Sequence, residues 1–499
     1  MGWRRRFVVV VLAVALAASA CGGDGGGAGD AAAPRAGGGL RVAVGEDIWP
    51  LTGRGPSSKA FAAGEVNVDV YEPLLRLGPD FTVRPGLAER WEPVDATTWR
   101  FHLRPGVRFH DGRPFGADDV VWSWSREFLP TAVTRTLTGV RKVDDLTVDL
   151  ALNAPNLRLP EQLVHPEGPI VPRNGHSDDQ PPVGTGPFRV VEYVPRQRVV
   201  VERFDGYWGE KAAADRLTFV FMPDPAERAE AVEQGDVDVA ALPAFQAVTP
   251  PVRVVRAPPG LVHQLVFNPA GAPPSDLTAE AAVRRAVALA LDRPRYVAEV
   301  LGGHGEAGRW LSPPAVLGGA AGSVAPPTHA PAMARAVLDE AGWRPGADGV
   351  RARGGRRLTL TTIGGPAVSE AALRFVQAQL SAVGVEVAVK KASDTVTYNE
   401  YRDRGYDLDL TAPNQNDANP AFLVAGRATD AQVATILAAP TREDVQRLAA
   451  EVTQALVHEE VRVVPLAVTS RAYALGDGVD LATVHPSAIN QPWTALVAR

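Results

Sequence analysis

Two short segments of the 499-residue chain carry residue types whose spacing suits a chemical site. Residues 303–308 (GHGEAG) match the G-x-G-x-x-G pattern, in which glycines let a pyrophosphate approach the start of a helix. That motif requires a strand before it and a helix after it. Residues 288–302 have a helical pattern instead, and residues 310–314 (WLSPP) do not favour the start of a helix. Nucleotide binding is therefore disfavoured.

Residues 458–462 (HEEVR) resemble half of the zinc motif H-E-x-x-H. Arg462 replaces the second zinc ligand, so we interpret the segment as the solvated end of a helix. The nine histidines are otherwise scattered, and the chain has no G-x-S-x-G or Walker-type sequence. A Ser-His-Asp site assembled from distant residues stays open, because such sites are recognised by geometry. The motifs thus predict no enzyme, no cofactor and no metal site.

The composition predicts a soluble globular body of about three structural units. Hydrophobic residues make up 45% of the chain and charged residues 22%. The net charge is -6, and beyond the N-terminus positive and negative residues are interspersed, which argues against a nucleic-acid partner. The single cysteine, Cys21, excludes an intramolecular disulfide and a multi-cysteine zinc site. The ten tryptophans could line a ligand pocket, but aromatic residues at strand and helix spacing more often pack a core.

The N-terminus has the layout of a signal peptide over residues 1–20. Three arginines at 4–6 precede an apolar run at 7–20, which is too short to span a membrane as a helix. The run ends in Ala-Ser-Ala before Cys21, which resembles the lipobox of bacterial lipoproteins, although leucine is commoner at the position of Ala18. Ordinary cleavage beside a chance cysteine is the alternative. We expect Cys21 to carry lipid and to anchor the protein.

Residues 22–39 (GGDGGGAGDAAAPRAGGG) contain almost nothing to bury. Together with Cys21 they predict a flexible tether over 21–39. The expected location is the outer face of a bacterial cytoplasmic membrane as a lipoprotein, or the periplasm.

Apolar periodicity predicts alternating strands and helices in the rest of the chain. Residues 97–112 alternate apolar and polar positions around Pro105-Gly106, which predicts a β-hairpin, and a helix is expected to begin near Asp118. Residues 358–390 predict strand, helix and strand, which argues for parallel pairing. A further amphipathic helix is expected over 331–341. The fold class is therefore α/β.

Several segments, taken in order, resemble the extracellular solute-binding proteins of family 5, the peptide- and nickel-type binding proteins of ABC importers. The hairpin sequence Phe-His-Asp-Gly followed by Ala-Asp-Asp-Val is specific to that family. The segments are YEPLLRL (71–77), LAERWE (87–92), WRFHLRPGVRFHDGRPFGADDVVWSW (99–124), GTGPF (184–188), FDGYW (204–208), EQGDVDVA (233–240), VFNP (266–269), VRRAVALALDR (283–293) and VVPL (463–466).

The resemblance implies a two-lobed periplasmic-binding-protein-like fold of type II, from the large cluster with an extra subdomain, and a ligand cleft between the lobes. Lobe I would comprise residues 40–266, with the extra subdomain at about 76–181. Lobe II would comprise 267–465, and 466–499 would return to lobe I. Chain crossings near 266–268 and 465–466 would then absorb lobe closure.

The implied function is capture of a small solute, preferably a peptide, for delivery to the permease subunits of an ABC-type importer by a monomer. An envelope accessory or sensor protein that binds a ligand without transport is the alternative. A secreted hydrolase has no motif support.

Ligand residues follow from the same resemblance. Residues 412–420 (APNQNDANP) are similar to the loop in which peptide binders place an amine-binding aspartate, which implies ligand roles for Asp417, Asn414 and Asn416. The loop is one residue shorter than in the family, and Asp417 could instead cap a turn before a proline. Asn268 and Trp49 are further ligand-binding candidates.

Overall fold

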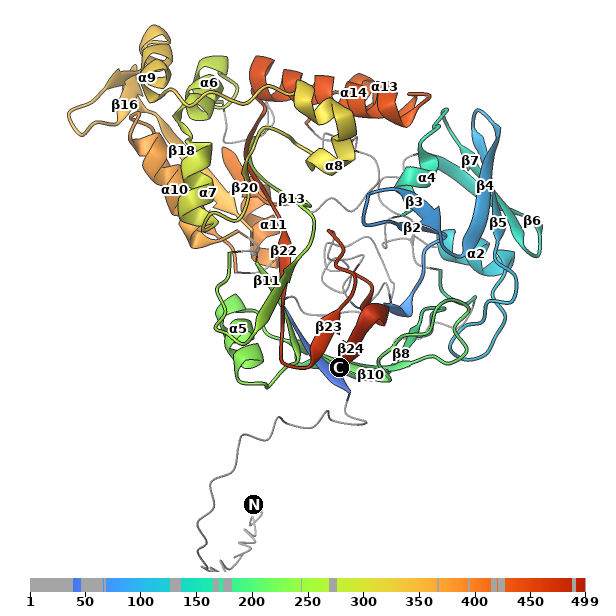
Figure 1. Ribbon diagram of the computed structural model, residues 1–499. Helices are drawn as coiled ribbons and strands as arrows, with labels where there is room; N and C mark the ends of the chain where they lie inside the picture. The colour runs from blue at the N-terminus through green and yellow to red at the C-terminus, as the bar shows by residue number, and fades with distance from the viewer. Residues whose placement is uncertain are drawn as a thin grey trace, which may run out of the picture. The chain divides into compact units, whose positions relative to one another are not determined.

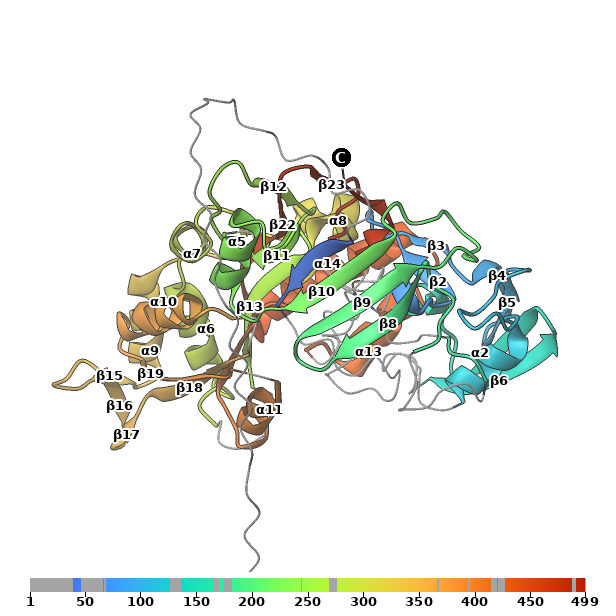
Figure 2. The same cartoon turned by 90° about the horizontal axis from the view of Figure 1, so that it is seen from below.

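The computed structural model describes most of the chain from residue 39 onward. Within that part, two large mixed sheets and a smaller third sheet are covered by helices (Figures 1 and 2). The described residues are 39–45, 66, 69–125, 136–164, 170–173, 182–243, 245–268, 276–365, 368–393, 395–413, 420, 427–486 and 491–498.

The first large sheet combines strands from both ends of the described chain. Its spatial order is β12 (Arg253–Arg256), β22 (Arg471–Leu475), β11 (Val239–Pro243), β1 (Leu40–Val44), β10 (Arg216–Phe221), β9 (Arg198–Arg203) and β8 (Phe188–Val194). β1 pairs in parallel with β10 and β11, and the other neighbours are antiparallel. Val42 and Phe219 on one face pack around Trp493, and Ala43 on the other face packs against helix α5 (Pro225–Glu233).

The second large sheet has a parallel part and an antiparallel part. Its spatial order is β14 (Glu306–Ala307), β21 (Val463–Thr469), β13 (Leu261–Phe267), β20 (Leu408–Thr411), β18 (Thr359–Gly364) and β19 (Glu386–Lys391). β18 pairs in parallel with β19 and β20, and the other neighbours are antiparallel.

Helices cover both faces of this second sheet. One face packs against α6 (Ala281–Ala290), α7 (Arg293–Val300), α9 (Pro331–Glu340) and α10 (Glu370–Ser381). The opposite face packs against α8 (Pro314–Leu317), α13 (Asp430–Leu437) and α14 (Arg442–Gln454). Helix α11 (Thr395–Asp403) lies between β19 and β20 in the sequence.

A separate apolar core holds the third sheet together. The sheet is β4 (Ala88–Asp95), β5 (Thr98–Leu103), β7 (Thr147–Leu152) and β6 (Leu137–Asp144), accompanied by β2 (Leu75–Leu77), β3 (Val83–Pro85), α2 (Ala117–Trp124) and α4 (Leu159–Gln162). Phe101, Phe109 and Leu150 are almost fully buried in this core. We call residues 74–170 the extra subdomain.

Short elements complete the described chain. They are β15 (Arg344–Pro345), β16 (Arg351–Arg353), β17 (Arg356–Arg357), β23 (Val479–Leu481), β24 (Leu496–Ala498), the 3-10 helices η1 (Gly318–Ser323) and η4 (Trp493–Ala495), and the π-helix η2 (Ala455–Glu459). The last of these ends the helical segment at residues 458–460, where the sequence predicted a helix end.

Glu72, just before the extra subdomain, ties Arg76 of that subdomain to the residues that follow β9 of the first sheet. Its carboxylate is buried and accepts hydrogen bonds from the Tyr207 hydroxyl at 3.0 Å and from Trp208 Nε1 at 2.8 Å, and it pairs with Arg76. Both aromatic residues follow β9. Two of the segments that carry the family resemblance therefore meet at one buried carboxylate.

The strand-helix-strand prediction for residues 358–390 is confirmed by β18, α10 and β19, which place the two strands in parallel register. The helix predicted over 331–341 is confirmed by α9. Gly384 and Gly342 follow α10 and α9 with positive φ angles of 87° and 82°, which glycine adopts without steric cost.

The predicted hairpin over 97–112 is wrong. β5 pairs with β4 on one edge and with β7 on the other, so no edge remains for a strand after Pro105-Gly106. Val107 and Phe109 instead pack into the core of the extra subdomain. The helix expected after this segment is confirmed by α2.

The crossings between the two large sheets differ from the predicted ones near 266–268 and 465–466. β13 and β21 pair with each other from Leu261 to Val266, so both strands stay in the second sheet. The chain therefore crosses at 257–260, between β12 and β13, and at Ser470, between β21 and β22. The lobe boundaries move with these crossings.

Candidate functional site

The carboxyl ends of the parallel strands in both large sheets lie beside the chain crossings. In the first sheet Pro243, the last residue of β11, pairs with Arg471, the first residue after the crossing at Ser470. In the second sheet Thr411, the last residue of β20, pairs with Gln264 in the middle of β13, and Pro413 after β20 accepts the backbone N–H of Val262 near the start of β13. Ligands of open α/β sheets bind outside the carboxyl ends of the strands. The strand ends at which ligands of such sheets bind thus lie where the chain passes between the two sheets.

Four of the predicted ligand residues come after the carboxyl ends of parallel strands. Asp417, Asn414 and Asn416 follow β20, and Trp49 follows β1. These four residues and Cys21 lie outside the described residues, so their roles stay predictions.

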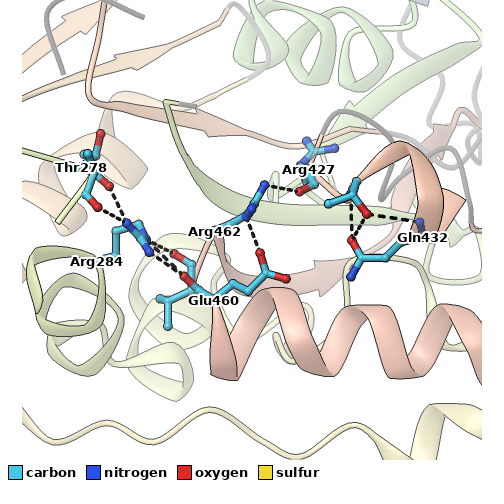
Figure 3. Close-up of polar contacts among 9 residues, drawn as sticks. Thr278, Arg284, Arg427, Gln432, Glu460 and Arg462 are labelled. Atoms are coloured by element: carbon cyan, nitrogen blue, oxygen red, sulfur yellow. Dashed lines mark hydrogen bonds and ion pairs between the residues drawn. The ribbon is translucent and has the colours of Figure 1, made fainter. Parts of the chain in front are cut away.

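Described residues fix both sides of the segment that holds Asp417. Before it, the backbone N–H of Val262 donates to the carbonyl of Pro413 at 3.3 Å. After it, Nη1 of Arg462 donates to the carbonyl of Arg427 at 3.3 Å (Figure 3). Val262 belongs to β13 of the second sheet, and Arg462 directly precedes β21 of the same sheet. The segment therefore starts and ends on one lobe.

A second arginine supports this anchor. Arg284 on α6 donates from Nε to the carbonyl of Glu460 at 3.2 Å and from Nη1 to the carbonyl of Thr278 at 2.9 Å (Figure 3). Glu460 in turn pairs with Nε of Arg462 at 2.5 Å. This network connects α6 to the turn before β21, and so it orients Arg462 toward Arg427.

Asn268 lies at the opposite edge of the second sheet from the crossings. It follows the carboxyl end of β13, which runs antiparallel to β20. Its Nδ2 donates to the carbonyl of Tyr406 at 2.6 Å, and its backbone N–H donates to the carbonyl of Asp407 at 2.9 Å. Asn268 thus joins the end of β13 to the start of β20, and a ligand contact by its side chain stays a prediction.

A pocket of about 580 Å³ opens at this opposite edge. The described residues that line it are all polar in type: Asn268, Asn399, Arg402, Asp403 and Tyr406.

Strand β20 carries a buried carboxylate between its two ends. Asp409 is 6% exposed, and its Oδ2 accepts a hydrogen bond from the Tyr398 hydroxyl at 2.6 Å. Burial raises the pKa of Asp409, while the Tyr398 hydrogen bond and the charges of Arg402 and Arg427 oppose that rise. Its Oδ1 is buried and has no hydrogen-bond partner among the residues that the structure describes. A protonated or cation-paired state would satisfy this atom.

Gln264 on β13 carries two further unpaired polar atoms. The residue is fully buried, and within the described part of the chain neither its Oε1 nor its Nε2 has a hydrogen-bond partner. Val266 pairs directly with Asp409, so Gln264 and Asp409 are diagonal neighbours on one face of the sheet. Sequence reasoning missed both residues. The available signal was the presence of polar residues within two short strands that are mainly apolar, LVHQLVF and LDLT.

The described residues offer neither a metal cluster nor a helix that spans a membrane. No group of three or more His, Cys, Asp or Glu side chains among them is placed to hold a metal ion. In the same part of the chain, no helix is both long and apolar enough to cross a membrane.

The fold and the facing strand edges define a two-lobed α/β binding protein. Residues 82–433 match the family described as bacterial extracellular solute-binding proteins, family 5 middle. The chain belongs to this family, which confirms the family and the fold class expected from the sequence.

Curated relatives differ in what they bind. The nickel-binding periplasmic protein of Escherichia coli strain K12 is 28% identical over 366 residues, which are 68% of this chain and 69% of the relative. The dipeptide-binding protein of the same strain is 30% identical over 321 residues, which are 56% of this chain and 59% of the relative. The family and these relatives are binding proteins.

Among solved structures, NikA from Brucella suis in complex with Fe(III)-EDTA is similar with a TM-score of 0.78 and 25% identity. The match covers 92% of this chain and 99% of that chain. The fold of this family thus extends over nearly the whole described chain.

Proposed function

We propose that this protein captures a small solute between its two lobes, with peptides as the favoured class, and delivers it to the permease subunits of an ABC-type importer. The observation that carries the proposal is the family match over residues 82–433. The arrangement of the strand edges supports it, because a ligand held there would contact both lobes.

The peptide class rests on two further observations. A dipeptide-binding protein is among the curated relatives, and the residues after β20 resemble the amine-binding loop of peptide binders. A closing cleft strips water from a ligand ammonium group, so the ammonium needs a carboxylate nearby. Asp417 would supply that carboxylate, and Asn414 and Asn416 would position the loop or contact peptide groups.

Titration calorimetry with trialanine and N-acetyl-trialanine tests the ligand class. We expect trialanine to bind and the acetylated peptide to bind at least tenfold more weakly, because acetylation removes the charge. Asp417→Asn is expected to weaken trialanine binding by more than tenfold, since loss of one partner of a buried charge pair costs about 2 to 5 kcal/mol. Asp430→Asn, an exposed acidic residue at the start of α13, serves as the control and should leave binding unchanged.

Binding of a nickel(II)–histidine chelate in place of either peptide would overturn the peptide class and keep solute capture. Equal affinities of wild type and Asp417→Asn would remove Asp417 from the ammonium site.

The remaining parts of the proposal concern location and transport. A signal peptide at 1–20 and a lipid on Cys21 would hold the tether, residues 21–39, at the outer face of the membrane. Neighbouring genes for two permeases and two ATPases would support delivery to an importer. An isolated gene would favour the accessory or sensor protein.

A further inference from the structure

A pair of arginine contacts joins the extra subdomain to the helices of the second sheet. Arg158, just before α4, donates from Nε and Nη2 to the carbonyl of Ala439 at 3.0 and 2.9 Å. The same Nη2 donates to the carbonyl of Pro440 at 2.5 Å. Both carbonyls follow the carboxyl end of α13, and Figure 1 shows this end of α13 beside α4. The guanidinium of Arg158 thus bridges two consecutive backbone carbonyls in the turn after α13.

The surroundings of Arg158 favour this contact. Its Nη1 pairs with Glu161 at 3.1 Å, and the two side chains are only 14% and 15% exposed. Its backbone N–H is held by Oδ1 of Asn156 at 2.9 Å. The carboxyl end of a helix carries partial negative charge, which attracts a cation. Hydrogen bonds from a charged donor are about twice as strong as those between neutral groups.

A second arginine reaches in the opposite direction. Arg442, the first residue of α14, donates from Nη2 to the carbonyl of Phe81 in the extra subdomain at 3.3 Å. Val316 on α8 adds an apolar contact, because its side chain belongs to the core cluster of the extra subdomain. Gln446 on α14 donates to the carbonyl of Val316 at 3.0 Å and so ties that helix to α14. We call the contacts of Arg158 and Arg442 the clasp.

The two sides of the clasp belong to different sheets. The extra subdomain is tied to the first sheet through Glu72 and through His110, whose backbone N–H donates to the carbonyl of Gly184. Helices α13 and α14 are tied to the second sheet, because Ile436 and Val445 pack with strand residues such as Val463. The clasp is therefore a connection between the lobes that is separate from the backbone crossings at 257–260 and Ser470.

We propose that the clasp holds the lobes together in the absence of ligand and so sets how often the cleft opens. Separation of the two sheets would pull Arg158 away from both carbonyls, and water would then replace them as acceptors. Loss of hydrogen bonds to a charged group is enough to change the ratio of closed to open molecules at least tenfold. The apparent affinity for a ligand would change with the open fraction.

Pulsed electron–electron resonance on ligand-free protein tests the clasp. Cys21→Ser removes the single cysteine, and Glu89→Cys on β4 with Glu340→Cys on α9 gives one exposed spin-label site on each side. We expect Arg158→Ala to raise the ratio of long to short label separations at least tenfold. Arg442→Ala should shift it in the same direction by a smaller factor, because it removes one longer hydrogen bond.

Arg100→Ala is the matched control. Arg100 makes a bidentate pair with Asp149 at 2.7 and 2.9 Å within the extra subdomain and takes no part in the clasp. This control should leave the separations unchanged. Arg158→Lys, which keeps the charge but cannot span both carbonyls, gives an intermediate shift and guards against misfolding of the alanine variant, with unfolding curves as the check.

Unchanged separations in Arg158→Ala, or an equal shift in Arg100→Ala, would overturn the proposal. So would a wild-type protein that shows only the long separation. Because every measurement is made without ligand, failure of the clasp leaves the proposed solute capture untouched.

Discussion

His110 and Gly186 are joined by a hydrogen bond between segments 76 residues apart, in which Nε2 of the ring donates to the Gly186 carbonyl at 3.0 Å. On the other side of the ring, the backbone N–H of Gly184 donates to Nδ1 at 3.2 Å. The neutral ring therefore carries its proton on Nε2 and uses both nitrogens. Burial lowers the pKa of His110 to about 4.

The first prediction is a loss of stability on acidification. A histidine whose pKa is lowered in the folded state stabilises the fold fully above its unfolded pKa of 6.5, and this contribution is lost as the pH falls toward 4. The shift corresponds to at most about 3 kcal/mol. Denaturant midpoints of wild type should fall between pH 7 and pH 4, whereas His110→Gln should show a flatter dependence from a lower starting stability. Parallel pH curves for the two proteins would contradict the assignment.

The second prediction is a loss of stability as the pH rises. Asp69 is buried and accepts the backbone N–H of Trp493 at 3.2 Å, and burial raises its pKa to about 8. The unfolded carboxyl ionises above pH 4 while the folded one stays protonated, so stability is lost as the pH rises from about 4 toward 8. Asp69→Asn imitates the protonated acid, and we expect it to gain stability over wild type at pH 8 but not at pH 4.

Asp80 provides the control for this prediction. It is exposed, and the Thr82 hydroxyl and backbone N–H help to lower its pKa to about 2. Asp80→Asn should therefore give no gain at pH 8. If Asp69→Asn has the same advantage at both pH values, Asp69 is not the titrating group.

The third prediction concerns the membrane anchor. Wild type should partition with membranes, whereas Cys21→Ala should be released or remain as uncleaved precursor, because one cysteine alone can carry the lipid. Cell fractionation with immunoblotting measures both properties. The same membrane association and the same processing in both forms would defeat the lipoprotein claim.

The fourth prediction concerns motion about the crossings. The chain passes between the sheets at 257–260 and at Ser470, so backbone rotation there should absorb lobe closure. Small-angle scattering should show a smaller radius of gyration once a verified ligand is added, because the ligand closes the fraction of molecules that is open without it. The decrease should be larger in Arg158→Ala than in wild type, because loss of the clasp raises that open fraction. An unchanged radius at saturating ligand would count against closure.

Local periodicity predicted the local elements well. β18, α10 and β19 follow one another directly, and each buries one face, so apolar spacing identified all three. The turn and helix ends at Gly342 and Gly384 were equally local.

Apolar periodicity does not reveal which distant strands pair with each other. β5 takes β7 as a partner, 49 residues away between Arg100 and Asp149, and nothing within residues 97–112 indicates that both its edges are occupied. The crossings taken from the family resemblance fell within or beside β13 and inside β21, because no residue type in these strands marks the change of sheet. Buried polar residues such as Gln264 and Asp409 were missed since, in a sequence, a polar residue in a strand indicates an exposed face.

Identification of the bound solute tests the central claim most directly. Solute capture predicts that protein purified without denaturation carries a small molecule, which mass spectrometry detects in roughly one-to-one ratio after release. The proposed peptide class predicts that this molecule has a peptide bond and a free amine. A ligand of another class would revise the specificity. The absence of any released solute, together with no binding of peptides or metal chelates by the emptied protein, would contradict the account.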